Sequence, residues 1–552
     1  MLSRFLIYLY NDMSGVMVGW LANYTNKSYF IFTPDGILEG STFLHFFDSL
    51  IIRILSSFLD PVALFNLLIL INIFLFIFFC LILFKAISGR RNLVIYLLFS
   101  LTMVVQPYFV YRVISGTSSL YYIFLFPLIF YLLYKRSNTF FVALITLLAF
   151  GFSSYYGYFL AAIVCFWYLA SLITKDLSVR QFFTKVFQYL ALLVIGLLIF
   201  FGALIMKNSA LTSDYSFGSG DATRVYRAIE DFYSFSLRPW YFFIPPERSV
   251  YFGEFSDGAL KLVENTGYYL ADDYAAEEMA GSYMGWPYLL GLFTVCAVLL
   301  VGKLFKKKFD VFSEIYVHKA LINKLLLVLL FIFLVSLPPS FTINGLKIYT
   351  PSYILYYLVP MFRVLARWAV AIFFILLLIN LILFSSVMSH IKSMFGKVFL
   401  IVIFIVINYF TFALRLPIIN VSKPPEEIGF IKALPVDSKI AIYPSGDFYS
   451  IFWVLKHEKV LMNPRDVFSG EGIFDADSFS EMLITPEGAV SFDEHGGNYL
   501  VLYLDRISDQ SLQKIMELNS SIESRSDLVS FFELHVGEAI FNKQNVLIFE
   551  NN

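Results

Sequence analysis

The sequence contains little charge and little cysteine for its length. Charged side chains make up 15% of the 552 residues, while 59% of the residues are hydrophobic and the mean hydropathy is +0.74. This balance excludes an ordinary soluble domain and is typical of a polytopic membrane protein. Cys80, Cys165 and Cys296 each lie inside an apolar run without a suitably spaced second cysteine. We therefore expect neither a disulfide nor a metal–thiolate site.

The signatures of familiar soluble enzymes are also missing. The chain has no Walker loop, no strand-linked GxGxxG, no HExxH and no GxSxG. Its formal net charge is −1, and its basic residues form short clusters between apolar runs, so we expect no nucleic-acid partner. No internal repeat is visible, which counts against a transporter built from two related halves. An activated substrate would have to arrive through the membrane.

Apolar runs long enough to cross a bilayer predict a bundle of about 10 to 11 spans. Eight of the runs are clear: 62–84, 93–113, 118–134, 187–206, 286–302, 322–338, 364–386 and 398–416. The run from Thr139 to Ile173 is too long for one span and is interrupted between Gly151 and Gly157. It predicts two short helices joined by an external tip.

Basic residues mark alternate connections between these spans. The clusters are Lys85 with Arg90 and Arg91, Lys135 with Arg136, Lys306 to Lys308, and Lys392 with Lys397. By the positive-inside rule these connections are cytoplasmic. Residues 11–60, 207–284 and 341–363, and everything after Pro417, are then expected outside the membrane.

The two ends of the chain differ from the membrane part. Phe5 to Tyr10 is apolar but stops at Asn11, so it predicts either a helical stub whose upstream half is absent from this chain or an interfacial segment. From Ser422 the composition becomes that of a soluble domain. We expect a membrane domain over 1–420 and a small extracytoplasmic α/β domain over 421–552, which makes the fold class mainly α. Within the second domain we expect strands at 439–443 and 499–503, a helix at 511–518 and a hairpin at 538–550.

Two arginines stand where one apolar run begins. Arg363 and Arg367 are at positions i and i+4, which places them on one face of the expected helix. A guanidinium group near hydrocarbon needs a counter-charge or water, and it matches phosphate oxygens in a bidentate fork. The pair therefore indicates either a phosphate clamp or arginines that reach up to lipid headgroups.

Other candidate site residues lie on the expected external side. Asp12 suits a general base facing the membrane, although a helix-capping role is the simpler interpretation. Asp48 follows His45 by one helical turn, so it could belong to a ligand pair or to a local hydrogen bond. Arg112 could join the anion site or reach to the interface. Tyr155 and Tyr156 mark the external tip.

Paired carboxylates raise the question of a metal. Asp272 with Asp273, and Glu277 with Glu278, are the kind of oxygen ligands that Mg²⁺ or Mn²⁺ prefers. A solvated charged surface explains the same pairs. A divalent cation stays open as a cofactor, and no metal ligand is assigned.

The arrangement over about residues 1–420 resembles the GT-C superfamily of polytopic glycosyltransferases, in particular its bacterial branch. The residues that carry the resemblance are Asn11-Asp12 before Gly19-Trp20, Pro34-Asp35-Gly36, Pro61 to Asn66, Pro107-Tyr108 with Arg112 and Gly116, Pro127, Tyr155-Tyr156, Met284-Gly285-Trp286, and Pro360 to Arg363 with Arg367. In such enzymes an acidic residue of the first external loop is the catalytic base. The resemblance transfers that role to Asp12, with Asp48 as the next candidate.

The resemblance implies a multi-pass glycosyltransferase of the cell membrane. It would move a sugar from a polyprenyl-phosphate donor to a glycan, lipid or protein acceptor of the cell envelope. Arg363 and Arg367 would hold the lipid phosphate, with Arg112, Tyr155 and Tyr156 beside them. A transporter or flippase of a lipid-linked saccharide, and a non-catalytic envelope-assembly protein, are the alternatives.

Overall fold

The computed structural model describes most of the membrane part and the C-terminal part of the chain. The described residues are 5–7, 46–55, 57–59, 61–89, 92–114, 120–208, 229–264, 276–305, 309–343, 346–359, 362, 364–415, 418–420, 424–444, 453, 456–462, 482–494 and 496–551. By contacts the chain divides into two compact units. One comprises Ile69–Arg112 and Ser119–Leu416, and the other Met1–Leu68, Val113–Ser118 and Pro417–Asn552.

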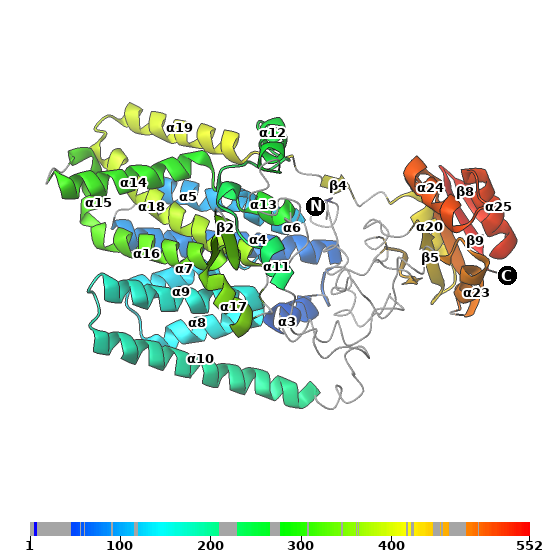
Figure 1. Cartoon of the computed structure of the whole chain (residues 1–552), viewed down its shortest axis with the longest axis horizontal. Helices are drawn as coiled ribbons and strands as arrows, with labels where there is room; N and C mark the ends of the chain where they lie inside the picture. Colours follow the sequence, from blue (N-terminus) through cyan, green and yellow to red (C-terminus); the bar gives the residue numbers. More distant parts are fainter. Residues whose placement is uncertain are drawn as a thin grey trace. The chain divides into compact units, whose positions relative to one another are not determined.

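The first unit is a bundle of apolar helices (Figure 1). Its long helices are α4 (Pro61–Ser88, which begins in the other unit), α5 (Leu93–Val105), α6 (Pro107–Ile114), α7 (Leu125–Tyr134), α8 (Thr139–Phe152), α9 (Ser154–Ile173), α10 (Val179–Asn208), α14 (Trp286–Leu304), α16 (Lys319–Ser336), α18 (Ala369–His390) and α19 (Met394–Phe412). Among the described residues, seven helices are long and apolar enough to cross a membrane, or eight if the bent pair α5–α6 is one span. The prediction of a mainly α, multi-pass membrane protein is confirmed.

Several expected spans differ in detail. The break between Gly151 and Gly157 is confirmed, because α8 ends at Phe152 and Ser153 caps the start of α9. The span expected at 118–134 is helical in the described structure only from Leu125, in the form of α7. A helix tolerates proline in its first turn but not in its interior. Pro127 accordingly lies in the first turn of α7.

Helix α18 is the centre of the bundle. It is apolar on all sides, as expected of a helix that is surrounded by others. Of its most apolar stretch 78% is buried, compared with 11% for both α10 and α19. Helices α5, α14 and α16 contact α18 directly. The apolar stretches of α10 and α19 are therefore largely open to lipid.

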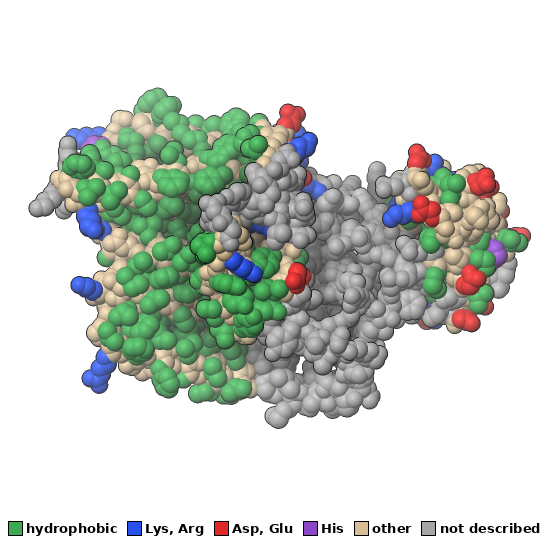
Figure 2. Space-filling model, in the orientation of Figure 1, with side chains coloured by type: hydrophobic (Ala, Val, Ile, Leu, Met, Phe, Trp, Pro, Cys, Tyr) green, Lys and Arg blue, Asp and Glu red, His purple; other side chains and the backbone are tan. Residues whose placement is uncertain are grey.

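The helix connections gather at two ends of the bundle. The short connections at 135–138, 174–178 and 391–393, with the described residues 309–318, lie at one end, on the left of Figure 1, where Figure 2 shows lysine and arginine side chains. We call it the basic-loop end. The longer connections lie at the other end. They contain α11 (Ile229–Ser234), η3 (Pro239–Phe242), α12 (Gly253–Glu264), α13 (Ala276–Gly281), the hairpin β2–β3 (Ser340–Ile343, Leu346–Tyr349), α17 (Pro351–Leu358) and η6 (Leu365–Trp368).

The second unit contains a mixed sheet of five strands in the order β6-β5-β7-β9-β8. The strands are β5 (Lys439–Tyr443), β6 (Val460–Leu461), β7 (Tyr499–Tyr503), β8 (Ala539–Lys543) and β9 (Val546–Glu550), accompanied by helices α20 (Glu426–Ala433), α23 (Pro486–Glu494), α24 (Asp509–Leu518) and α25 (Arg525–His535). Strand β5 runs parallel to β6 and β7, while β9 is antiparallel to β7 and β8. The expected strands, helix and terminal hairpin of this α/β fold are confirmed.

The beginning of the chain differs from the prediction. Residues Phe5–Ile7 form strand β1, which pairs antiparallel with β4 (Ile418–Asn420) of the same unit. The helical stub was therefore the wrong interpretation for these three residues, while the alternative, an interfacial segment, stays a prediction. Extended pairing satisfies the backbone of a run that is too short to be a stable helix. The second unit also contains α3 (Phe46–Leu55).

Candidate functional site

A bend between α5 and α6 sets the position of Arg112. The two helices meet at 53°, next to a proline that cannot donate a backbone hydrogen bond. The Gln106 side chain stabilises the bend, because its amide donates to the carbonyls of Tyr283 at 2.9 Å and Gly281 at 3.3 Å. Its oxygen accepts from the backbone N–H of Tyr108 at 2.8 Å. These bonds join the start of α6, and with it Arg112, to the end of α13.

The same contacts place Glu278, which lies on α13. A Cβ at Gly281 would lie 3.4 Å from the Tyr108 Cα, which is an ordinary van der Waals contact, so the end of α13 lies directly beside α6. Ser282 donates its hydroxyl to the Glu278 carbonyl at 2.6 Å and so closes the end of α13. The carboxylate of Glu278 thereby meets the guanidinium of Arg112.

Arg367 comes from the turn that precedes the central helix. Residues Leu365–Trp368 form the 3-10 turn η6, and α18 begins at Ala369. The N–H of Ala366 donates to the carbonyl of Phe235 at 2.8 Å, which fixes the turn. Val364 has φ −86° and ψ 79° and is not helical. The expected α-helical spacing of Arg363 and Arg367 is therefore wrong, and Arg363 itself lies outside the described residues.

The three side chains form a buried cluster, which we call the Arg–Glu–Arg cluster. Arg112 Nη2 donates to Glu278 Oε2 at 2.5 Å, and Arg367 Nε donates to Glu278 Oε1 at 3.1 Å. Arg112, Glu278 and Arg367 are 2%, 6% and 8% exposed. One carboxylate thus bridges two arginines that lie far apart in the sequence.

The two arginines hold Glu278 in its charged form. Burial raises the pKa of Glu278, but the neighbouring charges of Arg112 and Arg367 and their hydrogen bonds outweigh burial, so its pKa lies below the ordinary value. The carboxylate is ionised at neutral pH. Arg112 and Arg367 therefore both face a charged acceptor in a buried place, where the removal of either partner would be costly.

Arg367 keeps hydrogen-bonding capacity for an anion. Its Nε is used by Glu278, and the plane of its guanidinium lies over the Tyr155 ring, with Cζ 4.6 Å from the ring centre. Within the described part of the chain, its two Nη nitrogens donate to no acceptor. Both Nη groups form the fork that matches a phosphate.

An aromatic shell surrounds this arginine. Phe362 stacks on Tyr158 at 4.5 Å between ring centres and meets Tyr155 edge-on at 5.3 Å. Trp368 is fully buried against Phe159 at 4.1 Å. These rings fix η6 against the start of α9. They also exclude water, which strengthens the interactions of Arg367 with any charged ligand.

The predicted site residues have different places in the structure. Arg112, Arg367 and Tyr155 are brought together. Tyr156 is fully buried and donates to the Leu120 carbonyl at 2.7 Å, so it supports the fold of this end of the bundle. The remaining predicted residues, Asp12, Arg363 and the side chain of Asp48, lie outside the described residues.

The metal hypothesis receives no support from the described residues. Glu278, one of its four carboxylates, binds two arginines instead. Asp272 and Asp273, and the side chain of Glu277, lie outside what the structure describes. Among the described side chains no group of three His, Cys, Asp or Glu could hold a metal ion.

Sequence reasoning missed the role of Glu278 and a further buried arginine. Arg238 is 2% exposed and donates to the Tyr241 hydroxyl at 2.9 Å. Both residues lie in the long insertion, where charged residues usually face solvent. A buried arginine almost always needs an acceptor. That need was the one signal in the sequence that could have pointed to Glu278 as a partner of the arginines.

Comparison with protein-family models and with curated proteins gave no match to this chain.

Proposed function

We propose that the protein is a membrane glycosyltransferase that uses a polyprenyl-phosphate sugar as donor. The observation that carries the proposal is the pair of Nη groups of the buried Arg367, which donate to no acceptor within the described part of the chain. A lipid phosphate would accept from this fork, and its polyprenyl chain suits the apolar helices around the cluster. The acceptor is a glycan, lipid or protein of the cell envelope.

The proposed reaction is a direct displacement at the anomeric carbon. The acceptor hydroxyl forms the new glycosidic bond as the bond between the anomeric carbon and the phosphate oxygen breaks. Asp12 takes the hydroxyl proton, and the polyprenyl phosphate leaves with an added negative charge. Arg367 stabilises that growing charge, which is the part of the reaction that electrostatic catalysis assists most. Arg363 adds a second guanidinium from the same segment.

The transfer assay uses the full chain in lipid nanodiscs with a radiolabelled polyprenyl-phosphate sugar and envelope lipid extract. Arg367→Lys keeps the charge but loses the fork, so turnover should fall about 10- to 100-fold, as expected for losing a charged hydrogen bond worth about 1.5–3 kcal/mol. Arg238→Lys is the matched control, since Arg238 is equally buried but donates to a tyrosine. If turnover is unchanged in Arg367→Lys, the arginine does not act as a phosphate fork and its role is structural.

Asp12→Asn tests the chemistry. Asparagine caps a helix as well as aspartate does but cannot take a proton, so turnover should fall about 100-fold while donor binding is kept. Full turnover in this variant removes Asp12 from the mechanism. Donor binding without any transfer in the wild-type protein favours a flippase or transporter of the same lipid-linked saccharide.

The proposal requires the cluster to face outward. The basic-loop end is the cytoplasmic one by the positive-inside rule, so the opposite end and the C-terminal domain are extracytoplasmic. After replacement of the native cysteines, Leu262→Cys on α12 and Val436→Cys should label from outside; these residues are 71% and 84% exposed. Lys392→Cys, in the loop between α18 and α19, should label from inside. Labelling of all three variants from one side would contradict this orientation.

A further inference from the structure

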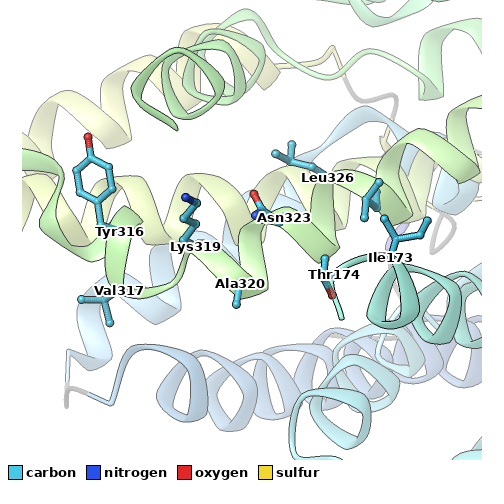
Figure 3. Close-up of a pocket in the computed structure, with 9 residues that line it drawn as sticks. Ile173, Thr174, Tyr316, Val317, Lys319, Ala320, Asn323 and Leu326 are labelled. Carbon is cyan, nitrogen blue, oxygen red and sulfur yellow. The ribbon is translucent and has the colours of Figure 1, made fainter. Parts of the chain in front are cut away.

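A second candidate site lies at the basic-loop end of the bundle. A cavity of about 760 Å³ opens where the end of α9 meets α16 and the preceding short helix α15 (Ser313–Val317), as Figure 3 shows. Its volume is in the range of about 300–1,000 Å³ that is usual for sites of small ligands. It is distinct from the Arg–Glu–Arg cluster, because the cluster lies near the first residues of α9 and α18, whereas the cavity lies at the last residues of α9. We call it the α16 groove.

The wall of the groove changes from charged to apolar along α16. Lys319, Asn323 and Leu326 follow one another at intervals of four and three residues, which places them on one face of the helix. Figure 3 shows Lys319 and Asn323 projecting on the same side. At the end of α9, Thr174 supplies a hydroxyl and Ile173 an apolar surface. The groove is therefore amphipathic along its length.

The polar groups of α16 in the groove are not matched by protein groups. Within the described residues, Lys319 forms no ion pair and the half-buried side chain of Asn323 makes no hydrogen bond. The nearby Lys324 differs, because it forms an ion pair with Asp176. The positive charge of Lys319 is thus available to pair with a ligand that is not part of the described chain.

We propose that the α16 groove binds one anionic phospholipid in the leaflet at the basic-loop end. The headgroup phosphate pairs with Lys319, Asn323 donates to an ester or phosphate oxygen, and an acyl chain lies along Leu326 and Ile173. A soluble anion would leave the apolar part of the groove wet. A zwitterionic lipid would bring its own cation next to Lys319. Basic pockets between membrane helices on the cytoplasmic side are a general way of binding anionic headgroups.

The experiment counts bound lipids by native mass spectrometry of the full chain in detergent. The protein is titrated with phosphatidylglycerol and, separately, with phosphatidylcholine. Wild type should retain one phosphatidylglycerol at lower lipid concentration than one phosphatidylcholine. Lys319→Gln should weaken retention of phosphatidylglycerol about fivefold, the usual effect of one lysine at an anionic surface, and leave phosphatidylcholine unchanged. Lys392→Gln is the matched control, because this exposed lysine belongs to the same end of the bundle but not to the groove.

A second variant tests the groove without changing charge. Ala320 lines the groove and is exposed, so Ala320→Trp can fill the space without disturbing the core. It should abolish the specific phosphatidylglycerol while keeping the thermal unfolding temperature of the lipid-free protein. Three results would overturn the proposal: equal retention of the two lipids by wild type, unchanged phosphatidylglycerol binding in both groove variants, or an equal loss in Lys392→Gln. The last result would assign the effect to the general charge of this end.

Discussion

Glu278→Gln should strongly destabilise the bundle although the two side chains have nearly the same shape. The carboxylate accepts from Arg112 at 2.5 Å and from Arg367 at 3.1 Å, and it is the one negative charge of the cluster. Glutamine removes one negative charge from the cluster, and its amide group turns a donor toward one arginine. Leaving a buried charge without its counter-charge costs about 3–5 kcal/mol.

Thermal unfolding of the protein in nanodiscs measures this loss, and two variants serve as controls. Arg112→Gln combined with Glu278→Gln removes one charge of each sign, so the double variant should be more stable than Glu278→Gln alone. Glu314→Gln changes the same residue type at the basic-loop end, where Glu314 lies 3.7 Å from His318. That partly exposed carboxylate lies outside the cluster, and its replacement should change the stability by about 1 kcal/mol or less.

Two results would refute the charge argument. If Glu278→Gln unfolds at the wild-type temperature, the arginines do not depend on this carboxylate for compensation. If the double variant is as unstable as the single one, the loss comes from hydrogen-bond geometry and not from charge. Because the pKa of Glu278 is lowered in the folded state, its contribution is present above the ordinary carboxyl pKa and disappears as the pH falls through the lowered value.

Two further predictions concern the framework. Gly291→Ala should destabilise the bundle by about 1–3 kcal/mol, because the added Cβ would collide with the doubly hydrogen-bonded side chain of Asn380. Gly258→Ala, with no atom within 4 Å of the added Cβ, is the control in the same thermal assay. In the C-terminal unit, burial and Lys459 lower the pKa of His457 to about 3, so its folded form stays neutral and accepts from the Lys459 N–H. Below about pH 6.5 the unfolded chain binds a proton that the folded chain does not, so stability should fall by on the order of 2 kcal/mol at pH 5, measured by amide hydrogen exchange in β5 and β7.

The elements that sequence reasoning predicted best are those whose signals are local. The apolar runs became helices because their length and hydropathy are properties of neighbouring residues. The break near Ser153 was visible as a cluster of Ser, Gly and Tyr, and β5, β7 and the terminal hairpin were visible as apolar β-rich runs. The bend at Gln106 was not predicted, although Pro107 is a signal for the end of a helix. The apolar run continues across the bend, so it was interpreted as one straight span.

The candidate site was harder to predict because its central contact is not local. Glu278 is 166 residues from Arg112 and 89 residues from Arg367 along the chain. No spacing rule connects them, and the carboxylate pair around Glu278 is equally compatible with a metal or with solvent. The arginines themselves were recognisable, because a guanidinium group at the end of an apolar run is costly without a counter-charge. The identity of that counter-charge required the fold.

Some polar side chains inside the bundle are satisfied within the protein, which the guanidinium group of Arg367 is not. Asn380 donates to two backbone carbonyls, and Tyr288 donates to Asn408 at 2.7 Å, so these neutral groups are satisfied within the protein. Such internal pairs specify how helices pack. In the Arg–Glu–Arg cluster, by contrast, the described residues leave the Nη groups of Arg367 without an acceptor. A guanidinium group that is buried and only partly hydrogen-bonded gains most from a ligand that can accept from both Nη groups, and a phosphate can do so.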